Sequence, residues 1–316
     1  MEFELQIIRW LQSIRNAFLD NLFEFFTLFG EELVVIAVLG GIYWCVNKKV
    51  GERLAITVFI SLGINSLLKI IFMRPRPFMA DDSIINLRPE TSGGYSMPSG
   101  HAQSASTVFF GLYQFFKKRY LLIVAIVITV LVAISRMYIG VHYLSDVLVG
   151  GLLGILIAYL MYRWIGKKEN LAKIYLYIFI IAIVALLFTY GYNFITLNKE
   201  VFESSQYYFN TEAISKMLGT LVGFVIGVKI EKQYVNFENH TIIWKNAVRV
   251  ILGIGIIFLT RIVFKEIFHL IANPEQLVDD QPFLSILASF FDFLRYVIMV
   301  VVGIGIYPML FKKIKI

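Results

Sequence analysis

Long apolar stretches separated by short polar connections make up most of the chain from residue 31 onward. A helix needs about 20 apolar residues to cross the hydrocarbon layer of a membrane, and about nine stretches come close to or exceed this length. Their residues do not alternate with a period of two, which excludes a barrel, so we predict an all-α, polytopic membrane helical bundle. The expected spans are residues 31–47, 51–73, 99–116, 120–138, 144–164, 171–195, 213–230, 242–266 and 284–311.

The first 30 residues follow a different pattern. Apolar residues recur near helical spacing with charged residues between them, which is typical of an amphipathic helix lying in the membrane interface. We expect it on the outer surface near the functional site, and a polar-faced helix packed on the bundle is the alternative. With no uncharged core and no small-residue cleavage site, a signal sequence is not expected. The apolar positions are Phe3, Ile7, Trp10, Leu11, Ile14 and Phe18, and the charged ones Glu4, Arg9, Arg15 and Asp20.

Composition agrees with a membrane protein, because 58% of the 316 residues are hydrophobic and 16% are charged, with a mean hydropathy of +0.74. The formal net charge is +7, but the basic residues are dispersed, so we expect no nucleic-acid partner. The single cysteine, Cys45, lies inside the first expected span, which makes an intrachain disulfide impossible.

Basic residues also predict the orientation of the helices. If the expected spans are right, most of them fall in connections on one face, which is then cytoplasmic together with the C terminus. We expect the plasma membrane of a bacterium, with the functional site facing outward. The basic residues on the inner face are Lys48, Lys49, Arg53, Lys117, Lys118, Arg119, Arg163, Lys167, Lys168, Lys173, Lys229, Lys232, Lys245, Lys312, Lys313 and Lys315.

Three short sequence segments, called phrases below, carry polar and charged residues. In such an apolar chain these residues indicate a functional site, because charged groups are costly inside a membrane. The phrases are Lys69–Pro77 (KIIFMRPRP), Tyr95–His101 (YSMPSGH) and Ser135–Asp146 (SRMYIGVHYLSD). Between the first two, prolines and a pair of glycines predict a turn-rich loop over residues 74–98. A loop of this size commonly covers a site.

Each phrase suggests part of an anion site. Lys69 and Arg76 would repel each other unless an anion lay between them, although both side chains could instead reach lipid phosphates. In the second phrase, Pro98 is expected at the first helical position. The amides of Ser99, Gly100 and His101 would then form an oxyanion or phosphate cradle, unless the phrase is an ordinary helix start.

The third phrase places His142 and Asp146 four residues apart. On a helix, the carboxylate would orient the imidazole and leave its other nitrogen as a nucleophile or base. Alternatively, Asp146 caps the helix or pairs with Arg136. The two remaining histidines, His240 and His269, are expected in loops as ordinary surface residues.

Together the phrases resemble the signature of the type 2 phosphatidic acid phosphatase superfamily. The matching parts are a lysine, six residues and Arg-Pro; Pro-Ser-Gly-His; and Ser-Arg, five residues, His, three residues and Asp. The resemblance covers roughly residues 30–165, and the six-residue spacing selects Arg76 over Arg74. We therefore expect an amphipathic segment at 1–30, a phosphatase core at 31–165 and additional transmembrane helices at 166–316.

The resemblance implies a two-step covalent mechanism. His142 would attack phosphorus to form a phosphohistidine, Asp146 would orient His142, and His101 would protonate the leaving oxygen. Water would then hydrolyse the intermediate, and no metal or other cofactor is expected. The residues implied to bind the phosphoryl oxygens are Lys69, Arg76, Ser99, Gly100 and Arg136.

The leading hypothesis is an integral membrane phosphatase that hydrolyses a lipid phosphate or diphosphate monoester at the outer face. Its partners would be the bilayer and a phosphorylated lipid or isoprenoid. The expected layout is also similar to that of the glucose-6-phosphatase branch, so a soluble ester such as a sugar phosphate is the alternative. A different class of protein, a non-catalytic phospholipid binder or transporter, is a further alternative. It is disfavoured because binding alone would not require a histidine nucleophile with an aspartate to orient it.

One further pair lies in the last two expected spans. Arg261 and Asp292 fall at similar depths if each helical residue advances about 1.5 Å. We predict that they form an ion pair with Arg295 nearby, and that the pair holds the two helices together.

Overall fold

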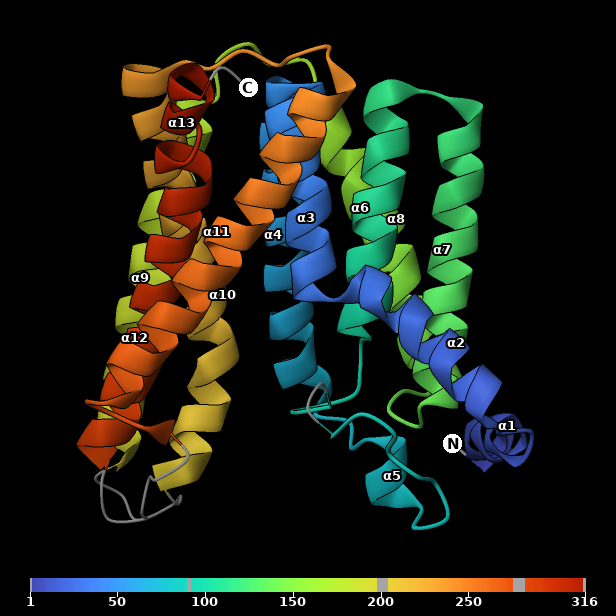
Figure 1. Cartoon of the computed structure of the whole chain (residues 1–316). Coiled ribbons are helices and arrows are strands. Elements are labelled where there is room, and N and C mark those ends of the chain that lie inside the picture. Colours follow the sequence, from blue (N-terminus) through green and yellow to red (C-terminus); the bar gives the residue numbers. More distant parts are fainter. Residues whose placement is uncertain (1, 90–91, 198–203, 275–281, 315–316) are drawn as a thin grey trace. The chain divides into compact units, whose positions relative to one another are not determined.

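The computed structural model describes residues 2–89, 92–197, 204–274 and 282–314, and these residues form helices and connections without a strand (Figure 1). The chain divides into two compact units. The first contains residues 1–39 and 49–168, and the second contains residues 40–48 and 169–316. The division expected at residues 30 and 165 stays a prediction.

The first unit contains the helices that carry the three phrases. α6 ends at Phe116, followed by the C-cap Lys117 with a left-handed φ of 53°, and α7 begins at Arg119, so the two helices run antiparallel. The short connection from α7 to α8 reverses the chain again. The starts of α6 and α8 and the end of α7 therefore lie at the same end of the unit (Figure 1). The elements are α1 (Glu2–Ser13), α2 (Ala17–Thr27), the 3-10 turn η1 (Leu28–Gly30), α3 (Glu32–Gly41), α4 (Lys48–Phe72), α5 (Pro77–Ala80), α6 (Gly100–Phe116), α7 (Arg119–Tyr138) and α8 (Leu144–Ile165).

A ladder of buried polar side chains joins α4 to α6. The Asn65 side chain donates to Gln103 at 2.8 Å and to the Pro98 carbonyl at 3.3 Å. Gln103 in turn donates to the Ser61 hydroxyl at 2.9 Å, which lies 2.8 Å from the Thr107 hydroxyl. Because such groups are costly to leave unpaired in an apolar bundle, the ladder fixes the second phrase against the end of α4.

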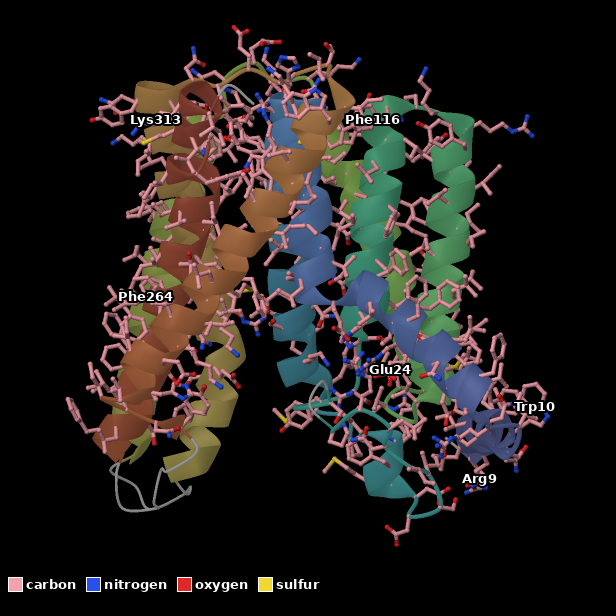
Figure 2. The ribbon with its side chains drawn as sticks, viewed as in Figure 1. Arg9, Trp10, Glu24, Phe116, Phe264 and Lys313 are labelled. Carbon is pink, nitrogen blue, oxygen red and sulfur yellow. The ribbon has the colours of Figure 1, made fainter. Side chains whose placement is uncertain are left out.

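The N-terminal segment forms two helices, α1 and α2, rather than one. The residues of α1 that are buried in the protein are Leu5, Ile8 and Leu11, and of these only Leu11 belongs to the apolar positions expected from the sequence. Phe3 and Trp10 are 67% and 62% exposed, and Trp10 points away from the bundle (Figure 2). The helix thus packs on its unit and also presents an aromatic face. Its position in a membrane interface stays a prediction.

The second unit contains the remaining helices. α10 and α12 approach closely, because a Cβ atom on Gly219 would lie 2.3 Å from the Phe293 carbonyl oxygen and one on Gly223 would lie 2.7 Å from that of Val297. Small residues four apart allow such backbone contact between membrane helices. The elements are the π-helical turn η2 (Ile42–Val46), α9 (Ala172–Leu197), α10 (Ser204–Ile230), the π-helical turn η4 (Glu231–Val235), α11 (Ile243–His269), α12 (Pro282–Val301), the π-helical turn η6 (Val302–Ile306) and α13 (Met309–Lys313).

Every expected apolar stretch coincides with a helix, which confirms the all-α membrane fold. Within the described part of the chain, however, five helices are long and apolar enough to span a membrane. The count rises to six if the bent pair Ala17–Gly30 and Glu32–Val46 forms one span. Nine spans are therefore not confirmed. The five are Lys48–Lys69, Arg119–Tyr138, Leu144–Ile165, Ile243–His269 and Phe283–Phe311.

The predicted partner of Asp292 is wrong. Asp292 pairs with Arg295 one turn later on α12 and accepts a hydrogen bond of 2.7 Å from Tyr208 on α10. Among the described residues, Arg261 is not bonded to Asp292. The ion pair thus lies within α12, and the hydrogen bond from Tyr208 links α12 to α10. His269 is also not in a loop, because it is the last residue of α11, where it lines a small pocket with Asp292 and Arg295.

Candidate active site

His142 and Asp146 meet at the start of α8. Because α8 begins at Leu144, His142 lies in the turn that precedes the helix, and Asp146 lies in its first turn. The contact still forms, with 3.4 Å between His142 Nδ1 and Asp146 Oδ2. The same carboxylate oxygen accepts a hydrogen bond of 2.9 Å from the Tyr143 amide, so Asp146 both caps the helix and faces the imidazole.

Arg76 lies on the other side of the imidazole. Its Nη1 atom is 3.4 Å from His142 Nε2. The guanidinium is held by three carbonyl groups, those of Gly93 at 2.7 Å, Gly94 at 2.9 Å and Val141 at 3.0 Å. Burial lowers the pKa of Arg76 to about 10, which keeps it charged at neutral pH. Arg76, which the six-residue spacing selects over Arg74, thus lies beside the His142 ring.

Further cations surround the imidazole. Burial lowers the pKa of His142 well below its ordinary value, and the charges of Arg76, Arg136 and Lys69 lower it further. A neutral imidazole is the form that can act as a nucleophile. His101 also acts electrostatically on His142, so residues of all three phrases lie close enough to affect its pKa.

Arg136 and Lys69 are each held by a neighbouring group. Arg136, in the last turn of α7, is fully buried and donates to the Thr27 hydroxyl at 2.9 Å. Lys69, near the end of α4, donates to the Tyr95 carbonyl. The bond from Lys69 to Tyr95 ties the first phrase to the second, and the bond from Arg136 ties the third phrase to the end of α2.

The start of α6 differs from its prediction. Ser99 is the N-cap and Gly100 the first helical residue, so Pro98 precedes the helix instead of opening it. The Ser99 amide is already bonded to the Asp146 carbonyl at 3.0 Å. The cradle is therefore limited to the first-turn amides of Gly100 and His101, for which the helix supplies no carbonyl.

Two polar atoms at this helix start are buried without a hydrogen-bond partner among the described residues. They are the Ser99 hydroxyl and Nε2 of His101. The Glu31 carboxylate lies 4.0 Å from His101 Nε2, beyond hydrogen-bond distance. Because buried polar groups are nearly always paired, an oxygen-rich ligand is the natural partner for both.

Arg74 is the residue that sequence reasoning missed. Its Nη1 atom donates to Asp146 Oδ1 at 2.9 Å, and the guanidinium stacks over the Tyr143 ring at 3.7 Å. Asp146 thus pairs with Arg74. The available signal was the second Arg-Pro in the first phrase. The family signature uses Arg76, so Arg74 could be expected to have another role, such as an ion pair with a carboxylate.

The loop and the turn after α7 are fixed by a close approach at Gly140. Gly140 has a φ of 84°, and a Cβ atom there would lie 2.5 Å from the Ile85 carbonyl oxygen. The Gln12 side chain donates to that carbonyl at 2.8 Å and accepts from the Ile85 amide at 3.0 Å. α1, the loop and the turn that leads to His142 are therefore joined at one point.

The fold and this site define an integral membrane protein with a buried histidine–aspartate pair among cations. Residues 52–170 match the PAP2 superfamily, and residues 215–316 match the PAP2 superfamily phosphatase, transmembrane extension. The chain belongs to the PAP2 superfamily, so the resemblance noted in the three phrases is confirmed.

Similar proteins are named as phosphatases. Sphingosine-1-phosphate phosphatase 2 of Homo sapiens is 31% identical over 155 residues, which are 47% of this chain and 38% of that protein. Undecaprenyl-diphosphatase of Sulfolobus acidocaldarius is 32% identical over 159 residues, 50% of this chain and 76% of that protein. A crystal structure of a transmembrane PAP2 type phosphatidylglycerolphosphate phosphatase from Bacillus subtilis aligns with a TM-score of 0.46 at 27% identity, over 54% of this chain and 87% of that one. The match to the human relative thus spans well under half of that protein's length.

Proposed function

We propose that this protein is an integral membrane phosphatase that hydrolyses a lipid phosphate or diphosphate monoester through a phosphohistidine on His142. The orientation of the His142 ring carries the proposal. A proton on Nδ1, which faces Asp146 at 3.4 Å, leaves the lone pair on Nε2. Nε2 faces Arg76 at 3.4 Å, where a guanidinium would hold a phosphoryl oxygen in reach of attack.

In the first step, Nε2 of His142 forms a bond to phosphorus while the bond from phosphorus to the leaving oxygen breaks. His101 donates a proton to that oxygen, which leaves as an alcohol or a phosphate group. In the second step, water gives a proton to His101 and attacks phosphorus. The phosphorus–nitrogen bond breaks, and phosphate is released with His142 restored.

The remaining cations would stabilise the transition state. Arg76, Arg136 and Lys69 act together on His142, and each would contact phosphoryl oxygens. The unpartnered Ser99 hydroxyl and the amide of Gly100 would donate to the same group. These assignments need no metal ion for charge neutralisation, and the absence of a cofactor stays a prediction.

A phosphorylated lipid or isoprenoid is the proposed substrate class. The names of the relatives support it, since they include a sphingosine-1-phosphate phosphatase and an undecaprenyl-diphosphatase. Activity on phosphatidate or an isoprenoid diphosphate in detergent micelles should exceed activity on glucose 6-phosphate. Activity on the soluble ester alone would replace this substrate class with the sugar-phosphate alternative.

The proposed location is the plasma membrane of a bacterium, with the site outside. In the first unit, Lys117 and Lys118 lie at the opposite ends of α6 and α7 from the site (Figure 1). By the positive-inside rule, the site end is then external. In a Cys45→Ser background, an impermeant thiol reagent should label Asp82→Cys in intact cells and should label Lys118→Cys only after lysis.

His142→Ala tests the mechanism directly. The variant should release no phosphate above background and form no acid-labile phosphoenzyme. His240→Ala, which changes a histidine of the second unit, is the matched control and should behave as wild type. Unchanged phosphate release by His142→Ala would refute the mechanism.

A further inference from the structure

Helix α1 reaches the candidate site through one carboxylate. Glu4 accepts a hydrogen bond of 2.7 Å from Arg74 on one oxygen and one of 2.7 Å from the Ser145 amide on the other. Arg74 uses its other guanidinium branch to donate to Asp146 at 2.9 Å. A continuous series of polar contacts therefore runs from Glu4 through Arg74 and Asp146 to His142.

Several groups contact the Arg74 side chain at once. Glu4 and Asp146 bind separate nitrogens of its planar guanidinium, and the Tyr143 ring lies against its face at 3.7 Å. A rigid fork of this kind loses its direction when one acceptor is removed. Without Glu4, the side chain would be drawn toward any anion that binds among Arg76, Arg136 and Lys69, which lie near the same site.

The position of α1 does not depend on Glu4 alone. Leu5, Ile8 and Leu11 are buried in the cluster that also contains Tyr138, and Arg9 pairs with Asp81 at 2.6 Å. A change of Glu4 to its amide therefore leaves most of the attachment of the helix in place. This separates an effect on the site from an effect on folding.

We propose that Glu4 is a positioning residue for phosphoryl transfer, which holds Arg74 against Asp146 and so keeps Nδ1 of His142 oriented. The inference rests on the proposed function, because it assumes that His142 is the nucleophile. In this proposal, helix α1 influences the reaction indirectly, because Glu4 contacts Arg74 and not His142 itself. A Glu4 substitution should slow phosphohistidine formation more than it weakens substrate binding.

The test uses the full chain in detergent with radiolabelled phosphatidate and rapid-quench measurement of the phosphoenzyme. Glu4→Gln should lower the rate of phosphoenzyme formation about 10- to 100-fold with little change in KM, as expected for a small misplacement of a reacting group. Glu4→Asp, which keeps the charge on a shorter side chain, should give an intermediate rate. Glu2→Gln removes a carboxylate from the same helix that pairs with Arg9 at 2.8 Å, and it should react at the wild-type rate.

A wild-type rate in Glu4→Gln, or an equal loss in Glu2→Gln, overturns the inference. If Glu4→Gln fails to fold, Glu4→Asp decides, because a full rate in that variant also overturns it. The two proposals fail differently. Activity in His142→Ala removes the proposed function, whereas an inactive His142→Ala beside a fully active Glu4→Gln removes only the role of Glu4.

Discussion

Arg74 donates a hydrogen bond of 2.9 Å to Oδ1 of Asp146, and the other oxygen of that carboxylate lies 3.4 Å from His142 Nδ1. Both carboxylate oxygens are therefore engaged by different groups. A side chain bound at both oxygens has one orientation, so the direction of the imidazole is set by contacts outside the histidine itself.

Asp146→Asn tests this dependence. The amide keeps the size of the side chain but loses the ion pair with Arg74, and its NH2 group can face His142 or Arg74 unfavourably. Phosphate release should fall on the order of 10²- to 10⁴-fold, as for other carboxylates that orient a catalytic histidine. Asp82→Asn, in the exposed part of the loop, is the control. Retention of nearly full activity by Asp146→Asn would contradict the orienting role.

His101→Asn tests the proposed general acid. On an alkyl phosphate, loss of the proton donor should cost about 10²- to 10⁴-fold in rate. On p-nitrophenyl phosphate the loss should be much smaller, because the leaving phenolate needs little protonation. The ratio of the two losses is the measurement. Equal losses on both esters would assign His101 to binding instead.

The apolar pattern of the sequence was sufficient to predict the helices. Stretches such as 120–138 and 144–164 are long, apolar and bounded by charged residues, and they fold as α7 and α8 with ends shifted by at most one residue. Length alone overestimated the spans, because stretches such as 99–116 yield a helix that is too short or too polar to qualify by itself.

The site residues that could be predicted are those identified by their spacing along the chain. Arg76 and Asp146, both taken from the three phrases, lie 3.4 Å from the two nitrogens of His142. The contacts of Arg74 and Glu4 could not be predicted, because they join residues 70 to 141 positions apart and the sequence does not state which helices are neighbours in space. For the same reason Asp292 was assigned to Arg261 by depth, although Arg295 lies one turn away.

The depressed pKa of His142 predicts a loss of stability in acid. Burial, followed by the charges of Arg76, Arg136 and Lys69, lowers this pKa below the usual value of about 6.5. As pH falls through that value, the unfolded chain gains a proton at this histidine and the folded chain does not, so the free energy of unfolding decreases. Thermal melting in detergent should therefore show a larger acid-induced drop for wild type than for His142→Gln. His240→Gln should retain the wild-type drop, and equal drops in all three proteins would contradict the prediction.

Gly140→Ala should distort the turn that carries His142. With φ at 84°, an added Cβ would be strained and would lie 2.5 Å from the Ile85 carbonyl oxygen and 2.8 Å from Nε2 of Gln12. Strain of this type costs about 1–3 kcal/mol, and the backbone contact adds to it unless the loop moves.

Movement of the loop would shift the carbonyl groups that hold Arg76, so activity should fall together with the melting temperature in detergent. Gly151→Ala on α8 is the matched control, because its Cβ would lie 3.6 Å from Thr129, an ordinary contact distance. If Gly140→Ala melted and reacted like Gly151→Ala, the close approach at Gly140 would have no part in fixing the site.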